Sequence, residues 1–481
     1  MNIVSIFFIL FYIVVLARVL LTVLLERGSP ARTLAWTLFI IMMPVIGIGS
    51  FFLFGKRVRK RRLFQVKHSP EVEQLYQYVQ EQHLAAEQTA LEAEEVLAPN
   101  RRLIRLMARS GNALLTSGNE VAVLQDGKAT FESILEAIRE AHEFIHILYY
   151  IIEEGEMAER LFSLLAEKEK EGVTVRVIFD GFGSWFLSRA YLKKLRASGI
   201  DILPFVPLSL WRFFNKINYR NHRKIVVVDG KVGFTGGINI SDKYLHGDPE
   251  LGHWRDTHLR IEGPAVSGLQ FAFLTDWYFV KGEYLIRKQD LFPGNRTKGD
   301  TYAQIIAGGP NNIFANIKQQ YFAMITGAER YIYLATPYFI PGENILFALK
   351  TAALSGVEVR LILPYNSDSI ILKWSVRAYL EELMEAGVEV FFYMDGFLHS
   401  KIIIADDLVA SIGTANVDER SFEHNFEINA LIYDPQICLQ LKQQLQDDLI
   451  NCQQLEPEVF RKRPARDKIR ESLVRLLEPL I

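Results

Sequence analysis

The chain has 481 residues, of which 49% are hydrophobic and 23% are charged, and its formal net charge is −2 at neutral pH. This length allows two to four domains with a large core, and the near-neutral charge argues against a protein that binds nucleic acid through bulk positive charge. The two cysteines, Cys438 and Cys452, lack metal-ligand spacing. We interpret both as packing residues, which suits a reducing compartment.

Two apolar segments begin the chain. Residues 3–25 are almost wholly apolar apart from Arg18, and residues 33–54 contain no charged side chain. As a helix, each segment is long enough to cross ~30 Å of hydrocarbon. The short polar turn between them contains Gly28 and Pro30, so we predict a transmembrane hairpin of two helices within residues 1–62. Two buried core helices are the alternative interpretation.

A basic cluster follows the second apolar segment. Six of the seven residues at 56–62 are lysine or arginine, whereas the turn at 26–32 contains two cations. Because the cytoplasmic flanks of membrane helices carry the excess of cations, this asymmetry predicts a multi-pass protein of the cell membrane with its catalytic body on the cytoplasmic side. Residues 63–118 are polar and helix-prone, and we expect them to form a helical connector.

One pattern of reactive side chains occurs twice further along the chain. The stretches NHRKIVVVDG and LHSKIIIADD both read H-x-K-x-x-x-x-D, and each is followed by a glycine and an asparagine, in TGGIN and IGTAN. The matching residues are all 177 positions apart, so the two copies are not independent chance matches. The sets are His222, Lys224, Asp229, Gly236 and Asn239, and His399, Lys401, Asp406, Gly413 and Asn416.

The repeat extends beyond these motifs. GVTVRVIFDGFGS matches GVEVRLILPYNSDS, and SGIDILPFV matches AGVEVFFYM. Short β runs that alternate with helical patterns predict an α/β layer in each copy. We therefore expect two similar halves, residues 119–298 and 299–481, with a boundary in the Gly- and Pro-containing segment FPGNRTKGDTY.

The spacing within each motif indicates phosphoryl chemistry. His222 and Lys224 are two residues apart before a continuous apolar run, so in a strand their side chains point to the same face. The ammonium group can bind phosphate oxygens, and the imidazole can attack phosphorus or move a proton. Asp229 has the other parity and ends the run, so we expect it to hold the structure together. The same reasoning applies to His399, Lys401 and Asp406.

These residues resemble the phospholipase D superfamily, whose signature is two H-x-K-x-x-x-x-D motifs, each followed by G-[GST]-x-N. Among its members the chain looks most like bacterial cardiolipin synthases, because of the N-terminal hairpin with its basic flank, TPYF at 336–339 and GTANVDERSFEHNFEIN. The resemblance covers nearly the whole chain and implies an α/β fold of two similar halves packed around one central site. It implies no metal or other cofactor, and no Asp, Glu, His or Cys cluster in the sequence has ligand spacing.

The resemblance also implies a two-step transfer of a phosphatidyl group. His222 is the expected nucleophile, which displaces glycerol from phosphatidylglycerol and leaves a phosphatidyl-histidine intermediate. His399 is expected to protonate the departing alkoxide and then to deprotonate a second phosphatidylglycerol, which attacks to give cardiolipin. The expected contacts to the phosphate oxygens come from Lys224, Lys401, Asn239 and Asn416. Because the two histidines are chemically alike, the residues themselves leave open which one attacks.

A nucleophilic imidazole needs a defined tautomer, so we expect a carboxylate on its second nitrogen. The family has an acidic residue after each G-x-N motif, and the candidates are Glu427 in NFEIN and Asp256 in HWRDT. For Asp256, a surface ion pair with Arg255 or Arg260 is the alternative. The segment LWRFFNKINYR at 210–220 mixes aromatic and basic residues, which suits a loop at a lipid interface or a packing loop.

The motifs leave two other functions open. Another phospholipase D-type transfer or a hydrolysis has the same motifs, because that choice depends on admitting an alcohol and excluding water. A membrane scaffold that binds anionic lipid without turnover is the non-enzymatic alternative. The expected partners are phosphatidylglycerol and cardiolipin in the membrane, without nucleic acid, whereas the sequence does not indicate protein partners, acyl-chain preference or oligomeric state.

Overall fold

The computed structural model of the chain describes residues 3–25, 30–51, 70, 72–74, 76–77, 95–206, 219–285, 291–293 and 297–477. The basic cluster at 56–62 lies outside the described residues. The same is true of residues 207–218, which include most of the aromatic and basic segment before the first motif.

Three helices form the N-terminal region, α1 (Ile3–Leu25), α2 (Pro30–Met42) and α3 (Pro44–Ser50). The second apolar segment is therefore not one continuous helix. The backbone N–H of Met43 still donates to Phe39, but Pro44 has no backbone N–H and interrupts the helical hydrogen bonding there. The three helices pack on one another through buried apolar side chains of Val19, Val23, Trp36, Ile40 and Phe51. Within the described ranges, no helix combines the length and the apolarity needed to cross a membrane.

Among the described residues, the body of the protein is built on one sheet of 15 strands, in the order β19-β13-β12-β10-β15-β16-β18-β9-β1-β8-β6-β5-β2-β3-β4. The first half supplies β1 (Thr116–Gln125), β2 (Phe144–Tyr149), β3 (Thr174–Phe179), β4 (Asp201–Pro204), β5 (Ile225–Val228), β6 (Val232–Gly236) and β8 (Thr257–Glu262). The second half supplies β9 (Thr301–Gly308), β10 (Tyr331–Ala335), β12 (Glu358–Pro364), β13 (Glu389–Tyr393), β15 (Ile402–Ala405), β16 (Val409–Gly413), β18 (Glu427–Tyr433) and β19 (Cys452–Gln454).

The strand order shows the duplication directly. Outward from the centre, the first half runs β1-β8-β6-β5-β2-β3-β4 and the second runs β9-β18-β16-β15-β10-β12-β13, with β19 added at the edge. Strands β1 and β9 join the halves as an antiparallel pair in which Thr116 is opposite Ala303. The fold is therefore two similar α/β halves that share one sheet, as the repeat in the sequence predicts.

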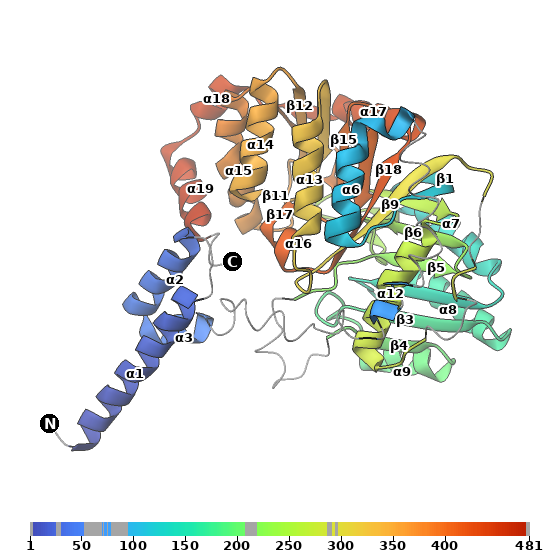
Figure 1. Cartoon of the computed structure of the whole chain (residues 1–481), viewed down its shortest axis with the longest axis horizontal. Coiled ribbons are helices and arrows are strands. Elements are labelled where there is room, and N and C mark those ends of the chain that lie inside the picture. The colour runs from blue at the N-terminus through green and yellow to red at the C-terminus, as the bar shows by residue number, and fades with distance from the viewer. Residues whose placement is uncertain are drawn as a thin grey trace.

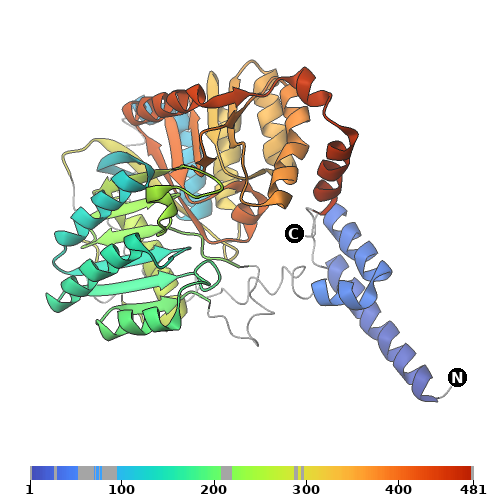
Figure 2. The same ribbon diagram turned by 180° about the vertical axis from the view of Figure 1, so that it is seen from behind.

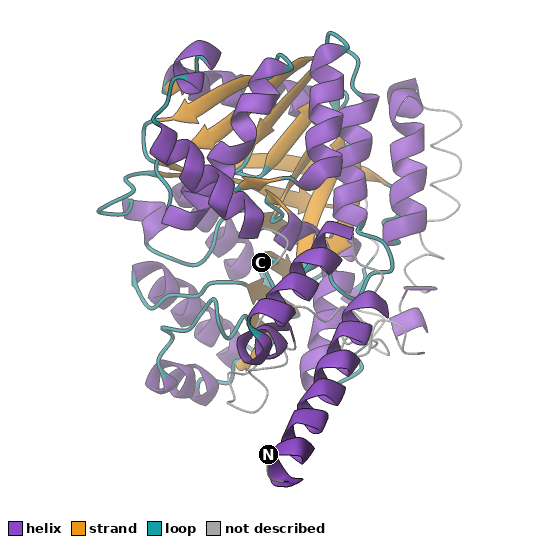
Figure 3. Ribbon diagram, turned by 90° about the vertical axis from the view of Figure 1, so that its left-hand side faces the viewer, coloured by secondary structure: helices purple, strands orange, loops and turns teal. Residues whose placement is uncertain are grey.

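Helices cover both faces of the sheet (Figure 3). Those of the first half are α7 (Asp126–Arg139), α8 (Glu156–Lys170), α9 (Arg189–Ala197), α11 (Lys243–His246) and α12 (Val266–Lys281), preceded by the short helix η3 (Glu95–Asn100) and by α6 (Arg101–Gly111). Those of the second are α13 (Asn316–Gly327), α14 (Gly342–Leu354), α15 (Ile370–Glu385), α16 (Glu419–Glu423), α17 (Pro435–Ile450), α18 (Pro457–Arg461) and α19 (Ala465–Leu477).

The strands inside the two histidine motifs, β5 and β15, lie in the middle of their halves. Every residue of β5 and of β15 is buried, because strands pair with both edges and helices cover both faces. Their sequences, IVVV and IIIA, are the continuous apolar runs that such a position requires. The motif residues are thus attached to the most deeply packed part of each half.

Short pairings outside the main sheet interlock the halves. Strand β7 (Trp254–Arg255) of the first half runs parallel to β14 (Phe397–Leu398) of the second. In the mirrored position, Asn221 of the first half forms a parallel bridge with Phe426 of the second. A third small pairing, β11 (Phe339–Ile340) with β17 (Val417–Asp418), lies within the second half. The first two pairings bring the start of each motif against the other half.

Candidate active site

The two histidines stand where the halves interlock. Each lies three residues before its buried strand, β5 or β15. The backbone N–H of His222 donates to the carbonyl oxygen of Phe426 at 2.8 Å, and that of His399 donates to the carbonyl oxygen of Arg255, also at 2.8 Å. Each motif is therefore fixed to the opposite half at the residue that carries its imidazole.

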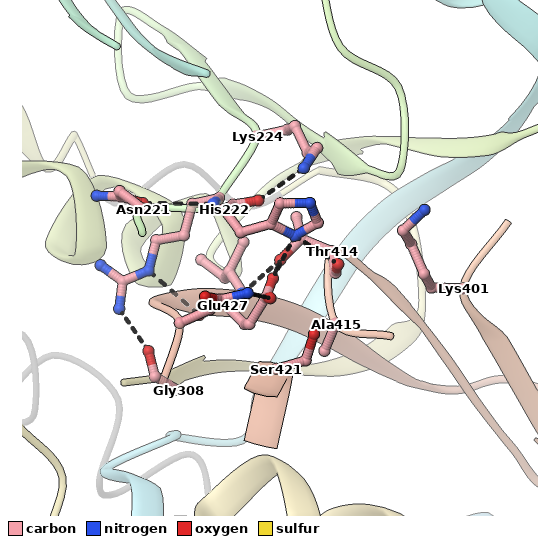
Figure 4. Close-up of polar contacts among 12 residues, drawn as sticks. Asn221, His222, Lys224, Gly308, Lys401, Thr414, Ala415, Ser421 and Glu427 are labelled. Atoms are coloured by element: carbon pink, nitrogen blue, oxygen red, sulfur yellow. Dashed lines mark hydrogen bonds and ion pairs between the residues drawn. The ribbon is translucent and has the colours of Figure 1, made fainter. Parts of the chain in front are cut away.

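Nδ1 of His222 faces two acceptors. Glu427 Oε2 lies 2.9 Å from this nitrogen and the carbonyl oxygen of Thr414 lies 3.1 Å from it (Figure 4). The hydroxyl of Thr414 donates to the same Glu427 oxygen at 2.6 Å. Because both neighbours of Nδ1 accept hydrogen bonds, the neutral ring carries its proton on Nδ1 and leaves a lone pair on Nε2.

Nδ1 of His399 has a different set of neighbours. Asp256 Oδ2 lies 2.7 Å away, the ammonium nitrogen of Lys401 lies 3.0 Å away, and the hydroxyl of Tyr244 lies 3.1 Å away. Two of these three groups can donate a hydrogen bond. Nδ1 of His399 can therefore accept from Lys401 or Tyr244 or donate to Asp256 Oδ2, so these contacts allow either tautomer.

Charges from both halves act within this one site. In Figure 4, Lys224, Lys401 and Glu427 are gathered around His222. Burial is the main reason that the pKa of each imidazole is lowered, and the charge of Lys401 adds to this for His222, as does the charge of Lys224 for His399. The structure thus places the histidines and lysines of the two motifs in one electrostatic environment.

The two motif lysines have matching positions. The ammonium group of Lys224 donates to the carbonyl oxygen of His222 at 2.8 Å, and that of Lys401 donates to the carbonyl oxygen of His399. Lys224 is completely buried and Lys401 is 1% exposed. This hydrogen bond holds each side chain, and Lys401 also contacts Nδ1 of His399 at 3.0 Å. Each ammonium group keeps at least one N–H for a phosphate oxygen.

The motif aspartates form a different kind of contact. Both Asp229 oxygens accept from the backbone N–H groups of residues 142–144, at 2.8 to 2.9 Å. Asp406 accepts in the same way from the N–H groups of residues 329–331, at 2.6 to 2.8 Å. Each carboxylate thereby ties the turn after its motif strand to the start of the neighbouring strand, β2 or β10.

The glycines of the G-x-N motifs leave room for a neighbouring side chain. A Cβ on Gly236 would lie 2.5 Å from Nδ1 of His258, and one on Gly413 would lie 2.2 Å from Oδ1 of Asn429.

The asparagines of the G-x-N motifs are buried beside the site. Asn239 accepts from the backbone N–H of Ile151 at 3.2 Å through Oδ1. Asn416 is 5% exposed, and its buried Oδ1 has no hydrogen-bond partner among the described residues.

Burial lowers the pKa of both imidazoles. For His222 it brings the pKa to about 4, against which the charge of Glu427 acts, while the charge of Lys224 acts in the same direction as burial. For His399, burial and the charges of Lys401 and Lys224 lower the pKa well below its usual value. Both rings are therefore neutral at pH 7 before a phosphate group arrives.

The pKa values of the lysines and carboxylates of the site also differ from their usual values. Burial lowers the pKa of Lys401 to about 8 and that of Lys224 well below the usual range. Burial raises the pKa of Asp256 to about 6. Burial also acts to raise the pKa of Glu427, but the hydrogen bonds and charges of its neighbours outweigh it, so that this carboxylate stays ionised.

Sequence reasoning missed Arg223, which supports the site. Arg223 lies between the motif residues His222 and Lys224 and is completely buried. Its guanidinium donates to Asp276 Oδ2 at 2.6 Å and to the carbonyl oxygens of Gly308 and Glu427 at 2.9 and 3.2 Å. It therefore joins the halves beside the first motif. The structure does not show the alternative for Asp256, a surface ion pair with Arg255 or Arg260. Arg255 pairs with Asp448, and Arg260 pairs with Glu262.

A metal site is not evident near these residues. Among the described residues, no group of three or more histidine, cysteine, aspartate or glutamate side chains is arranged to hold a metal ion.

The comparison with known protein families accords with this geometry. A family model described as "Cardiolipin synthase, PLD-like domain" matches residues 134–269 and 321–449, one segment in each half. The chain belongs to this family. Members that it resembles include a cardiolipin synthase of Geobacillus kaustophilus (strain HTA426), to which it is 43% identical over 96% of this chain and 91% of the relative.

A second family member aligns along its full length. The chain is 37% identical over 484 aligned positions to the major cardiolipin synthase ClsA of Bacillus subtilis (strain 168), with 100% of both proteins covered. The fold is similar to the crystal structure of phosphatidylserine synthase from Haemophilus influenzae Rd KW20, with a TM-score of 0.57 and 16% identity over 78% of this chain and 99% of that one. At this low identity the likeness concerns the fold alone.

Proposed function

We propose that the protein is a phosphatidyltransferase that makes cardiolipin and glycerol from two molecules of phosphatidylglycerol. The main support is the pair of neutral imidazoles, each contacted at Nδ1 by a carboxylate of the opposite half. Membership of a family whose relatives are named cardiolipin synthases supports this substrate and product. The two halves then form one site for one phosphodiester at a time.

In the first step, His222 acts as the nucleophile. Its Nδ1 donates to Glu427 Oε2 and the carbonyl oxygen of Thr414, so the lone pair of Nε2 is free to attack phosphorus. The P–N bond forms as the P–O bond to glycerol breaks. The ammonium groups of Lys224 and Lys401 bind the phosphate oxygens and counter their charge.

His399 provides and removes the proton. With the lipid bound, its ring is protonated at both nitrogens: Nδ1–H donates to Asp256 Oδ2, 2.7 Å away, and the Nε2 proton is transferred to the departing glycerol oxygen. The negative charge of the phosphodiester raises the pKa of this ring while substrate is bound. In the second step, Nε2 of His399 takes the proton of the second phosphatidylglycerol hydroxyl, whose oxygen then displaces His222 from phosphorus.

Asn239 and Asn416 complete the phosphate contacts in this mechanism. Both side chains are almost fully buried at the same position of the two repeats. The unpartnered Oδ1 of Asn416 accepts from a hydroxyl of the substrate, and the amide groups donate to phosphate oxygens. Asp229 and Asp406 support the site from a distance, through their backbone contacts.

We also place the protein at the cell membrane, with the body on the cytoplasmic side. Many apolar side chains of α1 to α3 are exposed, among them Phe7, Val14, Leu24, Met42 and Val45. Such surfaces are covered by lipid or protein in the cell. The cytoplasmic assignment rests on the cations at 56–62. We keep the domain division at 1–62, 63–118, 119–298 and 299–481 as part of this proposal.

A product assay tests the reaction. The purified protein in phosphatidylglycerol vesicles, without added metal, should release glycerol and form cardiolipin in equal amounts. Free phosphatidic acid as the main product would instead show a hydrolase. Absence of turnover with any alcohol acceptor would support a lipid-binding scaffold.

A further inference from the structure

Three large aromatic side chains are exposed within one short loop after β3. Phe182, Trp185 and Phe186 are 44%, 59% and 82% exposed. We name residues 180–187 the aromatic loop. Exposed large apolar residues that gather in this way mark a surface that contacts another molecule, whereas single ones do not.

The aromatic loop is held in place beside His222. Asp180 Oδ1 accepts from the backbone N–H groups of Phe182 and Gly183, both at 2.9 Å, while Oδ2 accepts from the backbone N–H of Asn221 at 2.9 Å. The loop also packs on Tyr150, because the hydroxyl of Ser184 donates to the carbonyl oxygen of Tyr150 at 3.1 Å.

Tyr150 in turn contacts the nucleophile. Its ring centroid lies 4.7 Å from that of His222. The aromatic loop is therefore attached directly to the mouth of the site, and its exposed side chains are presented by a fixed backbone. A surface that is already ordered loses little conformational entropy when it binds.

The second half carries an apolar loop at the same place in its repeat, after β12. Residues 365–369 form this loop, and Ile370 and Ile371 begin α15 directly after it. We name residues 365–371 together the second loop. Tyr365, Ile370 and Ile371 are 46%, 74% and 54% exposed. Asp368 of this loop accepts from the hydroxyl of Tyr338, and its charge acts on Lys401. The two loops therefore flank the site from opposite halves, one near each motif.

Cations accompany both loops. The guanidinium of Arg220 lies 4.2 Å from the ring centroid of Phe182, and the ammonium of Lys373 lies 5.8 Å from that of Tyr365. Arg420 of α16 is exposed, and its charge acts on Tyr150 and Arg220. Aromatic and aliphatic side chains beside cations match the boundary between acyl chains and anionic head groups.

We propose that the aromatic loop and the second loop insert together into the head-group region of an anionic phospholipid bilayer, so that the substrate head group passes between them to the histidines. The proposal builds on the proposed function, because it names the surface through which this site takes its lipid. Figures 1 and 2 show α1 to α3 below the second half of the body, and Figure 1 shows α16 at the lower edge of that half.

A double substitution separates docking from chemistry. The variant Trp185→Ala/Phe186→Ala of the full chain is compared with Leu354→Ala, which removes a side chain that is 74% exposed at the end of α14. On vesicles of phosphatidylglycerol diluted with phosphatidylcholine, the double variant should need about tenfold more phosphatidylglycerol for half-maximal rate. Tenfold corresponds to about 1.4 kcal/mol, which is less than full burial of two aromatic side chains contributes, because the head-group region buries them only in part. On a short-chain phosphatidylglycerol below its micelle concentration, its rate should stay within twofold of wild type. Leu354→Ala should match wild type on both substrates.

Two outcomes of this comparison contradict the proposal. Equal dependence on phosphatidylglycerol in the double variant and the wild type means that the loops do not dock on the bilayer. An equal loss on the vesicle and the short-chain substrate means that the loop only supports the active-site fold. If the wild type turns over neither substrate, the proposed function fails, and docking is then judged by a measurement that needs no turnover.

Fluorescence provides that measurement. Lipids brominated in their acyl chains quench tryptophan that reaches them, and the difference between wild type and Trp185→Phe isolates Trp185 from the other tryptophans. We expect stronger quenching in wild type than in Trp185→Phe in anionic vesicles. Equal quenching in both proteins overturns the proposal. It is also overturned if Trp185→Ala/Phe186→Ala converts an oligomer to a monomer by light scattering in detergent, because the loop is then an interface between copies of the chain.

Discussion

His222 and Glu427 are 205 residues apart in the sequence, yet Nδ1 of the histidine lies 2.9 Å from Oε2 of the glutamate. The mirrored contact joins His399 to Asp256 at 2.7 Å, across 143 residues. Each imidazole is therefore contacted by a carboxylate of the opposite half. Neither half can orient its own histidine alone, which gives a physical reason for the two copies to remain in one chain.

Removal of the charge on Glu427 should strongly reduce the rate. Glu427→Gln keeps the shape of the side chain but places an amide beside Nδ1 of His222, so the tautomer with a free Nε2 is no longer favoured. We expect kcat to fall by about 10²- to 10⁴-fold, the range for loss of an imidazole-orienting carboxylate. Steady-state kinetics with phosphatidylglycerol measure the change. Asp256→Asn should lower kcat similarly, through His399.

The control is a carboxylate that is remote from both histidines. Glu262 lies at the other end of β8 from Asp256 and pairs with Arg260. Glu262→Gln should keep a kcat close to wild type. A thermal melt of each variant separates lost chemistry from lost folding. A fully active Glu427→Gln protein would show that the carboxylate does not orient the nucleophile.

The alkaline limb of the pH profile should report Lys401. Burial lowers its pKa to about 8, so the free enzyme loses this ammonium charge as the pH rises through 8. Loss of this charge weakens the binding of the anionic phosphate. We therefore expect kcat/KM to fall tenfold for each pH unit above about 8. In Lys401→Arg, which stays charged, the limb should move beyond pH 10 although the rate is lower. Lys231→Arg, on the exposed turn after β5, should keep the wild-type limb.

The acid limb should report Asp256 and not His222. Burial raises the pKa of Asp256 to about 6, so this carboxylate is protonated below pH 6, whereas His222, with a pKa of about 4, stays neutral there. We expect kcat/KM to fall as the pH drops through 6, because His399 loses the charge beside its Nδ1. In Asp256→Asn the residual activity should be flat between pH 5 and 7. If kcat/KM of Asp256→Asn still falls through pH 6 as in wild type, the acid limb reports a group other than Asp256.

Asp229 should matter for folding more than for binding. Asp229→Asn keeps the left-handed backbone, at φ 50°, but turns one of its three acceptor contacts into a clash between two donors. We expect a loss of about 2–3 kcal/mol of unfolding free energy, the scale of hydrogen bonds to a charged group. Thermal unfolding and faster hydrogen exchange of the amides at 142–144 measure it. Asp300→Asn, at an exposed carboxylate, should change neither.

Several features of the fold could be predicted because local pattern determines them. The runs IVVV and IIIA are apolar at every position, which requires a strand covered on both sides, and β5 and β15 are such strands. The duplicated motif predicts two similar halves, which the strand order shows. The second N-terminal helix was predicted too long, because hydropathy alone gave no weight to Pro44.

The pairing of each histidine with the opposite half could not be predicted. It depends on the bridge between Asn221 and Phe426 and on the pairing of β7 with β14, and neither sequence segment shows its partner. Arg223 was missed because a charged residue between two motif positions looks like a solvent-facing one. The aromatic loop was missed because Phe182, Trp185 and Phe186 follow a strand with no reactive residue. The sequence directed attention instead to 210–220, most of which lies outside the described residues.

The most direct test of the account is to locate the phosphatidyl group on the enzyme during turnover. Wild type, His222→Ala and His399→Ala are mixed with phosphatidylglycerol, quenched in acid-free denaturant, digested and analysed by mass spectrometry for phosphatidyl-histidine. We predict an adduct on His222 in the wild type, more of it in His399→Ala, where the second step lacks its base, and none in His222→Ala. An adduct on His399, or turnover by His222→Ala, would contradict the roles given to the two halves.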